Sequence, residues 1–514
     1  MPPLAAPRVA RPNRRERRRQ RRTHAAAPRP LLDEAARYHR AGDLARAEAL
    51  YREILRQAPD DPDAHHLLGL IAHQTGHHEA AVRLIEQAIR GKPDFAGAYS
   101  NLALAYRETG RLDEALAAAR RGVALAPRDL AARLNLGTVY EAGGALEEAL
   151  AAYDAARALA GPADPRAEGN RAVVLQALGR FDDARSASEA ALARDPDYAV
   201  AHFVRGTLLL LAGRFAEGWR DYEWRFRDAA LLKGALRRAL PGERWDGGAL
   251  DGRTVLVHAD QGFGDAIQFV RYLPLVARRG GRVVLECQPA LTDLFSALPG
   301  VDSVVAQSES GAPAIAFDCH VPLTSLPGLF GTTLDSIPAD IPYLQAPPAR
   351  IDAWRDRLAG PGLAVGLVWA GGADLLDDSQ RSLDLAMLAP LADIPHMRVF
   401  GLQKGPAAEN DAAPFLENLG PDLTDFTETA AAIMALDLVI SVDTAVAHLA
   451  GALGRPVWTL LPFSPDFRWM LDRTDSPWYP GMRLFRQAQR GQWHPVIAAV
   501  AEALAERAAS AGPG

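Results

Sequence analysis

Glycine recurs with a nearly constant spacing through the first half of this 514-residue sequence. Six glycines follow one another at intervals of 34 or 35 residues, and an alanine stands five residues after each of the first five. Self-similarity at this period indicates a repeat array, in which each unit buries its apolar face against the next one. The glycines are Gly42, Gly76, Gly110, Gly144, Gly179 and Gly213, and the alanines are Ala47, Ala81, Ala115, Ala149 and Ala184.

Residues 94–127 show how one unit works. Tyr106 and its apolar neighbours face the core from a first helix, Gly110 turns the chain, and Ala115 lets a second helix pack closely. A helix-turn-helix unit of 34 residues is the tetratricopeptide repeat, so we expect an α-solenoid of about six repeats over residues 31–230. Such a solenoid forms a groove for a peptide or protein partner, and a rigid spacer is the alternative. Four aromatic residues are expected to cap its end against the next domain: Trp219, Tyr222, Trp224 and Phe226.

Composition sets the broad class of the protein. Apolar residues make up 48% and charged residues 23% of the chain, which is typical of a folded globular protein. Its two cysteines, Cys287 and Cys319, exclude a disulfide framework, and neither lies in a CxxC pair that would indicate zinc or redox chemistry. No apolar run approaches the roughly 18 residues of a membrane span, and no secretory signal pattern follows the basic start. We therefore expect a cytoplasmic protein without a membrane span.

The N-terminus carries a concentrated positive charge. Residues 1–30 contain ten arginines and one acid, Glu16, which leaves 47 basic and 62 acidic residues in the rest of the chain. A block of like charge flanked by Pro and Ala predicts a disordered tail. No aromatic residue is interleaved for base stacking, so a solvated tail is favoured over contact with RNA, an anionic membrane or an acidic partner. No specific nucleic-acid binding is predicted.

From Arg253 onward, predicted strands alternate with predicted helices. The strands fall into two sets, which the proline-rich segment Ile337–Arg350 separates. We expect two Rossmann-like halves, at residues 231–345 and 346–514, with a ligand in the cleft between them. The predicted strands are 254–258, 282–286, 301–306 and one near residue 317, followed by 364–369, 398–402, 438–441 and 456–461, with helices at 266–279 and 445–453.

The first loop of this region holds a candidate general base. Gly262 and Gly264 are predicted to lie in a tight loop directly after a strand, with Asp265 at its end. The loop lacks the third glycine of a dinucleotide fingerprint, but it offers backbone amides to a donor and a carboxylate at the carboxyl end of the strand. Asp265 is therefore a candidate base, and a plain helix N-cap is the alternative.

A second group of candidate residues couples a strand end to a helix start. Asp443 and Thr444 stand where free amides and the positive end of a helix attract a phosphate. His448 follows Thr444 by four residues and shares its helix face. All three are candidate donor-binding residues, although a capping aspartate and a buried core histidine are the alternatives.

Two further segments are predicted to reach the same cleft. Arg381 ends the loop after the first strand of the second half, and its guanidinium suits a diphosphate, with a surface arginine as the alternative. Gln403 and Lys404 follow the next strand and offer an amide and an ammonium group to a ribose or a phosphate. The pattern D-x-D occurs only at residues 61–63 and 195–197, where helix starts explain it better than metal ligands do, so no metal is predicted.

Together these motifs resemble GT-B glycosyltransferases related to the ADP-heptose lipopolysaccharide heptosyltransferases. The fusion to tetratricopeptide repeats further resembles bacterial repeat-containing transferases, among them flagellin-modifying enzymes, and the segment 457–479 is similar to these as well. The resemblance covers about residues 31–505. It implies a GT-B fold of two Rossmann-like halves that follows the repeat solenoid in the sequence.

The resemblance also assigns roles to residues. It implies that Asp265 is the base and that the segment containing Asp443, Thr444 and His448 cradles the phosphates of a nucleotide donor. Arg381 is the expected substitute for a lysine of that family. Alanine stands at position 445, where the family usually has glycine.

The resemblance implies an inverting, metal-independent transfer with a nucleotide sugar as co-substrate and no cofactor. A protein recognised by the repeat groove is the expected acceptor, with flagellin as one candidate. Two alternatives remain: a non-catalytic scaffold with a degenerate sugar-nucleotide domain, and a lipopolysaccharide-type transferase with a lipid-linked acceptor. The sequence leaves the sugar, the nucleotide base, the acceptor residue and the oligomeric state open.

Overall fold

The computed structural model describes residues 29–228, 231, 240–308, 311, 313, 315–372, 378–405, 407–408 and 414–511. Two compact units make up the chain, Met1–Val174 and Leu175–Gly514. Of the tail predicted over residues 1–30, residues 1–28 lie outside the described residues, and helix α2 begins at Arg29. Among the helices that are described, none combines the length and the apolar character that crossing a membrane requires.

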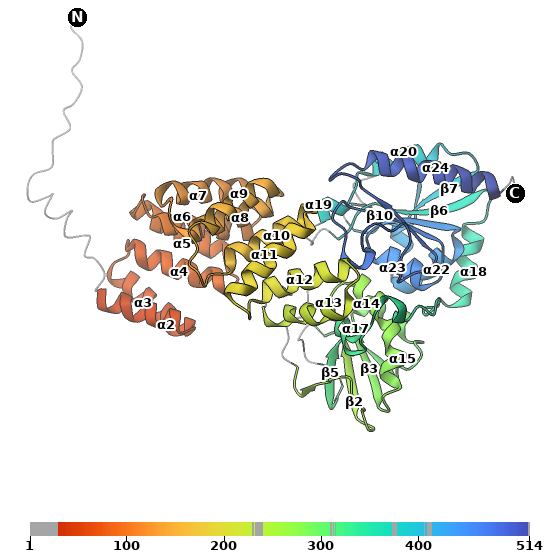
Figure 1. The fold of residues 1–514 in the computed structure, drawn as a ribbon, viewed down its shortest axis with the longest axis horizontal. Helices are drawn as coiled ribbons and strands as arrows, with labels where there is room; N and C mark the ends of the chain where they lie inside the picture. The colour runs from red at the N-terminus through yellow and green to blue at the C-terminus, as the bar shows by residue number, and fades with distance from the viewer. Residues whose placement is uncertain are drawn as a thin grey trace, which may run out of the picture. The chain divides into compact units, whose positions relative to one another are not determined.

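Six consecutive pairs of helices form the repeat region of the described residues (Figure 1). The glycine that turns the chain within each pair has φ between +72° and +80°, a conformation that glycine adopts without strain. The predicted solenoid of about six repeats is confirmed. Its helices are α2 (Arg29–Arg40), α3 (Leu44–Gln57), α4 (Pro62–Gln74), α5 (His78–Gly91), α6 (Ala96–Glu108), α7 (Leu112–Leu125), α8 (Leu130–Ala142), α9 (Leu146–Arg157), α10 (Arg166–Ala177), α11 (Phe181–Arg194), α12 (Ala199–Leu211) and α13 (Phe215–Tyr222).

Small residues set how closely the helices of a pair approach. The five periodic alanines are all fully buried. In the sixth pair Gly218 takes their place, and a Cβ built there would lie 2.7 Å from Cγ of Leu210. The last pair therefore packs more tightly than an alanine would allow.

The first half of the α/β region is a five-stranded parallel sheet in the order β1-β5-β2-β3-β4. Its central strands are buried, as expected for a parallel sheet covered on both faces. The strands are β1 (Glu243–Arg244), β2 (Thr254–His258), β3 (Arg282–Cys287), β4 (Ser303–Ala306) and β5 (Cys319–Pro322), and the helices are α14 (Phe263–Phe269), α15 (Leu273–Ala277), α16 (Thr292–Phe295) and α17 (Leu326–Leu329).

The second half is a six-stranded parallel sheet in the order β11-β10-β9-β6-β7-β8. One face of this sheet packs against α20 and α24, and the other against α22 and α23 (Figure 1). The strands are β6 (Leu363–Val368), β7 (Met397–Gly401), β8 (Glu417–Asn418), β9 (Leu438–Val442), β10 (Val457–Leu461) and β11 (Met482–Arg486). The helices are α18 (Pro348–Arg357), α19 (Asp378–Arg381), α20 (Ala389–Ala392), α22 (Phe426–Ala435), α23 (Ala445–Ala452) and α24 (His494–Ala511). Two Rossmann-like halves are thus confirmed.

One local prediction was wrong. The helix after β2 begins at Phe263 rather than at residue 266, so Asp265 belongs to its first turn and not to the preceding loop. This helix also ends early, at Phe269, and continues as a 3-10 turn and then as α15. Pro274, the second residue of α15, has no N–H to donate to the preceding turn, which accounts for the break.

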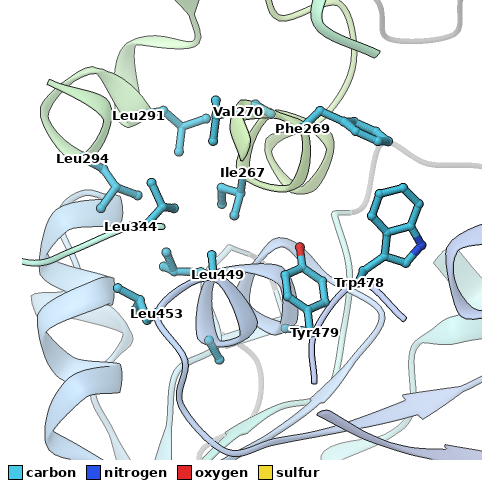
Figure 2. Packing of buried hydrophobic residues seen from close by; sticks show 14 of the residues in the cluster. Ile267, Phe269, Val270, Leu291, Leu294, Leu344, Leu449, Leu453, Trp478 and Tyr479 are labelled. Atoms are coloured by element: carbon cyan, nitrogen blue, oxygen red, sulfur yellow. The ribbon is translucent and has the colours of Figure 1, made fainter. Parts of the chain in front are cut away.

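The two halves share one hydrophobic core, because α14 of the first half packs against α23 of the second. Figure 2 shows Ile267 and Val270 above Leu449 and Leu453, with Tyr479 beside them. Two polar contacts accompany this packing. Tyr343 donates its hydroxyl hydrogen to the carbonyl of Ile267 at 3.0 Å, and Arg271 donates to the carbonyl of Trp478 at 2.8 Å.

The last repeat belongs to the same compact unit as both sheets. Phe215 and Trp219 lie in the shared core, and Nε1 of Trp219 donates to the carbonyl of Thr332 at 3.2 Å. From the second half, Ser464 donates its hydroxyl hydrogen to the carbonyl of Gln176 at 2.8 Å. Of the four aromatic residues expected to cap the solenoid, Trp219 and Tyr222 do so, whereas Trp224 stacks on a histidine of its own repeat.

Candidate functional site

Asp265 is the third residue of α14, where the first half meets the second. Its Oδ2 accepts the backbone N–H of Gly262 at 3.1 Å, so the carboxylate caps the start of the helix. Its Oδ1 forms an ion pair with Arg468, which lies in the 3-10 turn η9 (Phe467–Trp469) after β10. Burial raises the pKa of Asp265, while the charge of Arg468 and the Gly262 amide oppose that shift. The capping contact and a catalytic use of the carboxylate are compatible, and the role as a base stays a prediction.

Gly264 allows the two halves to approach each other at this point. A Cβ built on Gly264 would lie 2.9 Å from Cδ2 of His448 and 3.6 Å from Cα of Ala445. The first turn of α14 is therefore in direct contact with the first turn of α23. Gly262 is exposed, and a Cβ there would meet only the Asp265 carboxylate, at 3.4 Å.

Arg468 is the residue of this site that the sequence reasoning missed. Its side chain is only 10% exposed, and it contacts Asp265, Asp466 at 2.8 Å and the amide oxygen of Gln268. Burial alone would lower the pKa of Arg468, but Asp466 and Asp265 outweigh it and raise that pKa, so the guanidinium is charged. The sequence signal was Asp466-Phe-Arg468 within the segment 457–479, but no local pattern paired it with a residue 203 positions away.

Asp443 lies close to the same guanidinium. Burial is the main cause that raises its pKa from 3.8 to about 6, and the carboxylate of Asp466 adds to that shift. The positive charges of Arg468 and Arg381 partly offset it. Asp443 can therefore gain or lose a proton near neutral pH.

His448 is buried and held in one orientation. Its Nδ1 forms a hydrogen bond of 3.0 Å with the hydroxyl of Tyr479, and its ring stacks on Trp469 with centroids 5.2 Å apart. Burial, with Arg468 and Arg271 nearby, lowers the pKa of His448 well below its usual value, so the imidazole is neutral. Its Nε2 lies 3.8 Å from Oδ1 of Asp443.

Thr444 is the N-cap of α23, as the sequence predicted for a helix start. Its hydroxyl is hydrogen-bonded to that of the buried Ser441 at 2.9 Å. The first amides of a helix have no partner within that helix, so the backbone here can donate to an anion. Asp443, Thr444 and His448 are thus brought together around one helix start, and their donor-binding role stays a prediction.

The other three predicted residues lie on neighbouring loops. Arg381, at the end of α19, is close enough to Asp443 to affect its pKa, and residues 373–377 of its loop lie outside the described residues. The amide of Gln403 is engaged by the backbone, since its oxygen accepts the N–H groups of Trp369 and Ala370 at 3.1 and 2.9 Å. Lys404 is exposed and donates to the carbonyl of Leu423. The geometry therefore gives Gln403 a part in joining two loops, and its direct contact with a donor stays a prediction.

Across the described residues no group of three or more His, Cys, Asp or Glu side chains is arranged to hold a metal ion. The carboxylates of Asp466, Asp265 and Asp443 lie around the positively charged guanidinium of Arg468. This arrangement combines a carboxylate from one half with a helix start, a neutral imidazole and buried positive charge from the other. Such a set can accept a proton from one ligand and stabilise negative charge on another.

Comparison with protein families gives matches in the repeat region and in the second half of the α/β region. Tetratricopeptide repeat models match residues 38–105, 100–166 and 170–222. The model of glycosyltransferase family 9 (heptosyltransferase) matches residues 411–478, the segment that contains Asp443, His448 and Arg468.

Protein FlbA of Caulobacter vibrioides is 32% identical to this chain over 388 residues, which are 70% of this chain and 64% of FlbA. The chain therefore spans less than two thirds of the length of this curated relative. Among solved structures, a thermophilic TPR protein of Thermus thermophilus matches with 24% identity and a TM-score of 0.32, over 35% of this chain and 98% of that one. YrrB, described as a TPR protein with an unusual peptide-binding site, matches with 21% identity and a TM-score of 0.29, over 36% of this chain and 94% of that one.

Proposed function

The chain joins tetratricopeptide repeats to a glycosyltransferase family 9 (heptosyltransferase) domain, and on this premise we propose that it transfers a sugar from a nucleotide-sugar donor to a protein hydroxyl. The observation that carries the proposal is the contact of Asp265 with Arg468 beside Asp443. A carboxylate from one half thereby stands next to a helix start of the other half that suits a phosphate. This arrangement supports transfer between two ligands held by different halves.

The proposed reaction is a single displacement. Asp265 accepts the proton of the acceptor hydroxyl while that oxygen forms a bond to the anomeric carbon of the donor. The bond from this carbon to the phosphate oxygen breaks on the opposite face, and its electron pair leaves with the nucleotide, so the configuration is inverted. The start of α23 at Thr444, the neutral imidazole of His448 and the guanidinium of Arg381 are proposed to stabilise the leaving group in place of a divalent metal ion.

The acceptor is proposed to be a protein because stacked repeats of this kind form concave surfaces that bind peptides or proteins. The repeat-containing transferases that the sequence resembles include flagellin-modifying enzymes, so flagellin is the acceptor to test first. A lipid-linked sugar is the alternative acceptor, because the sequence also resembles the lipopolysaccharide heptosyltransferases. Incubating the protein with a flagellin substrate and, separately, with a lipopolysaccharide precursor distinguishes the two.

The donor is identified by thermal denaturation of the full chain in the presence of ADP-, UDP-, GDP- and CMP-linked sugars. A donor at 100 times its Kd stabilises the folded state by about 2.7 kcal/mol, so one nucleotide class should raise the melting temperature. If the folded protein responds to none of them, the non-catalytic scaffold is the better description.

Asp265→Asn tests the chemistry itself. The variant keeps the shape of the side chain and should still bind the donor, but we expect transfer to fall by at least about 100-fold because the base is lost. Asp293→Asn, an exposed carboxylate in the same half, is the matched control and should keep full activity. Full transfer by the Asp265 variant would remove this residue from the mechanism.

A further inference from the structure

Arg468 has no part in the reaction proposed above, although its guanidinium is buried at the centre of the site. It donates to Oδ1 of Asp265 and to the side-chain oxygen of Gln268, and it forms an ion pair with Oδ1 of Asp466 at 2.8 Å. Two of these partners, Asp265 and Gln268, belong to α14, whereas Arg468 itself comes from the second half. The side chain therefore fixes the helix that carries the candidate base.

A purely structural link between the halves does not need such a cluster of charges. Arg271 already provides one, since it is also buried and donates to the carbonyl groups of Trp478 and Gln268, both at 2.8 Å, and to the hydroxyl of Tyr343 at 2.9 Å. Its partners are neutral. Burying an ion pair stabilises a fold little compared with apolar packing, so the carboxylate partners of Arg468 call for another explanation.

The last repeat holds Arg468 and the loop before Asp265 in place. Phe467, the neighbour of Arg468, packs against Trp219 and Tyr222 of α13 with ring centroids 5.7 and 5.6 Å apart. The hydroxyl of Tyr222 accepts the side-chain N–H of Gln261 at 2.9 Å, and Gln261 directly precedes the start of α14. One helix of the solenoid thus contacts both members of the ion pair through their neighbours.

We propose that Arg468 is a positioning residue that aims the carboxylate of Asp265, and that the last repeat keeps this pair aligned through Tyr222 and Phe467. The inference rests on the proposed function, because it assigns a part in the same transfer. Oδ1 of Asp265 is held by Arg468 and Oδ2 by the Gly262 amide, so the carboxylate has one orientation. A displacement of a reacting group by about 1 Å costs on the order of 100-fold in rate, which is the effect to expect when this support is lost.

The charges that face Asp265 predict how the pH profile responds. Arg468 lowers its pKa, Asp466 raises it, and Tyr222 and Asp260 are the other titratable groups coupled to it. Tyr222 is neutral because burial raises its pKa to about 12. Removing the charge of Arg468 should therefore move the acidic limb of the rate profile to higher pH, by about one pH unit or more.

The experiment compares Arg468→Lys, Arg468→Met and the matched control Arg271→Lys in the full chain. Transfer with the donor identified by the thermal panel gives kcat across pH 5–9, and binding of that donor and melting temperature are measured alongside. We expect Arg468→Lys to keep the charge and the acidic limb but to lose about 10- to 100-fold in kcat. Arg468→Met should lose a similar factor in kcat and should also shift the acidic limb of the pH–rate profile. Arg271→Lys should lower the melting temperature but leave that limb unchanged.

A double variant separates positioning from folding. If Arg468 acts through Asp265, adding Arg468→Met to Asp265→Asn should reduce the residual rate by less than about twofold. Additive losses, or a pH profile of Arg468→Met that coincides with wild type, would overturn the inference. Failure of the proposed function looks different, since wild type would then show no transfer or Asp265→Asn would keep it.

Discussion

A fragment of residues 231–514 carries both sheets but lacks the repeat helices that share their core, so it should be much less stable than residues 164–514. In the shorter fragment, Phe467 loses Trp219 and Tyr222, and Trp478 loses Phe215. Both Phe467 and Trp478 are buried in the full chain. The deletion therefore exposes apolar surface in the folded state.

The size of the effect follows from these contacts. Burying one large apolar side chain contributes about 1.5–3 kcal/mol. Exposing Phe467 and the face of Trp478 that Phe215 covers therefore costs up to roughly 6 kcal/mol, since Trp478 keeps its contact with Phe269. The deletion also removes Arg225, whose buried guanidinium lies 3.8 Å from the buried carboxylate of Asp260. Removing one partner of a buried ion pair costs about 3–5 kcal/mol. Together these losses approach the 5–15 kcal/mol that typically stabilises a folded domain.

Urea unfolding followed by circular dichroism and tryptophan fluorescence measures the difference. Residues 164–514 include all of α10 and should unfold cooperatively, with a midpoint close to that of the same unit in the full chain. Residues 231–514 should show a broad transition at low urea and bind a hydrophobic dye. A cooperative transition of the shorter fragment at the same midpoint would refute the reasoning, because the repeats would then contribute nothing to this core.

Two further predictions concern the start of α23. Gly264→Ala places a Cβ 2.9 Å from the ring of His448, so the ring must shift and donor binding should weaken by about tenfold in a titration. The control is Gly481→Ala, at an exposed turn where a Cβ would meet nothing within 4 Å, and it should bind as wild type does. The pKa of Asp443 is raised from 3.8 to about 6, so the folded protein holds more protons than the unfolded chain and stability falls as the pH rises through this window. Asp443→Asn should therefore change little at pH 4 but stabilise the protein by up to about 3 kcal/mol at pH 8, and equal effects in urea unfolding at both values would contradict this.

The sequence predicts the repeats and strands well because their signals are local. A turn glycine in the left-handed region fixes the reversal of the chain in each unit, whatever the distant parts do, as Gly110 illustrates. The β6 strand was expected at residues 364–369 and lies at Leu363–Val368, because a continuous apolar run buried on both faces marks it. Long-range packing decides the exceptions, among them Gly218, which breaks the alanine series so that its helix can approach Leu210.

The site is only partly predictable for the same reason. Asp265 follows a strand of the first sheet, and Asp443 and His448 follow a strand of the second. Ligands bind at the carboxyl ends of parallel strands, which brought these three residues into the prediction. Arg468 was not predicted, because only the packing of one half on the other brings this residue to Asp265. Gln403 was predicted to contact a ligand because it follows β7. In the structure its side-chain oxygen accepts backbone N–H groups of the neighbouring loop.

The position of the last repeat gives the fusion of solenoid and α/β domain a physical meaning. Had the repeats been attached only by a linker, the core shared by the two α/β halves would consist of their own residues alone. Instead Trp219 and Tyr222 complete that core, and Tyr222 also contacts the loop that precedes Asp265. A ligand bound by the last repeat is consequently held by the same compact unit as the candidate base. Substitutions in α13 should then alter both the stability of the α/β halves and the alignment of the carboxylate, which separable modules would not do.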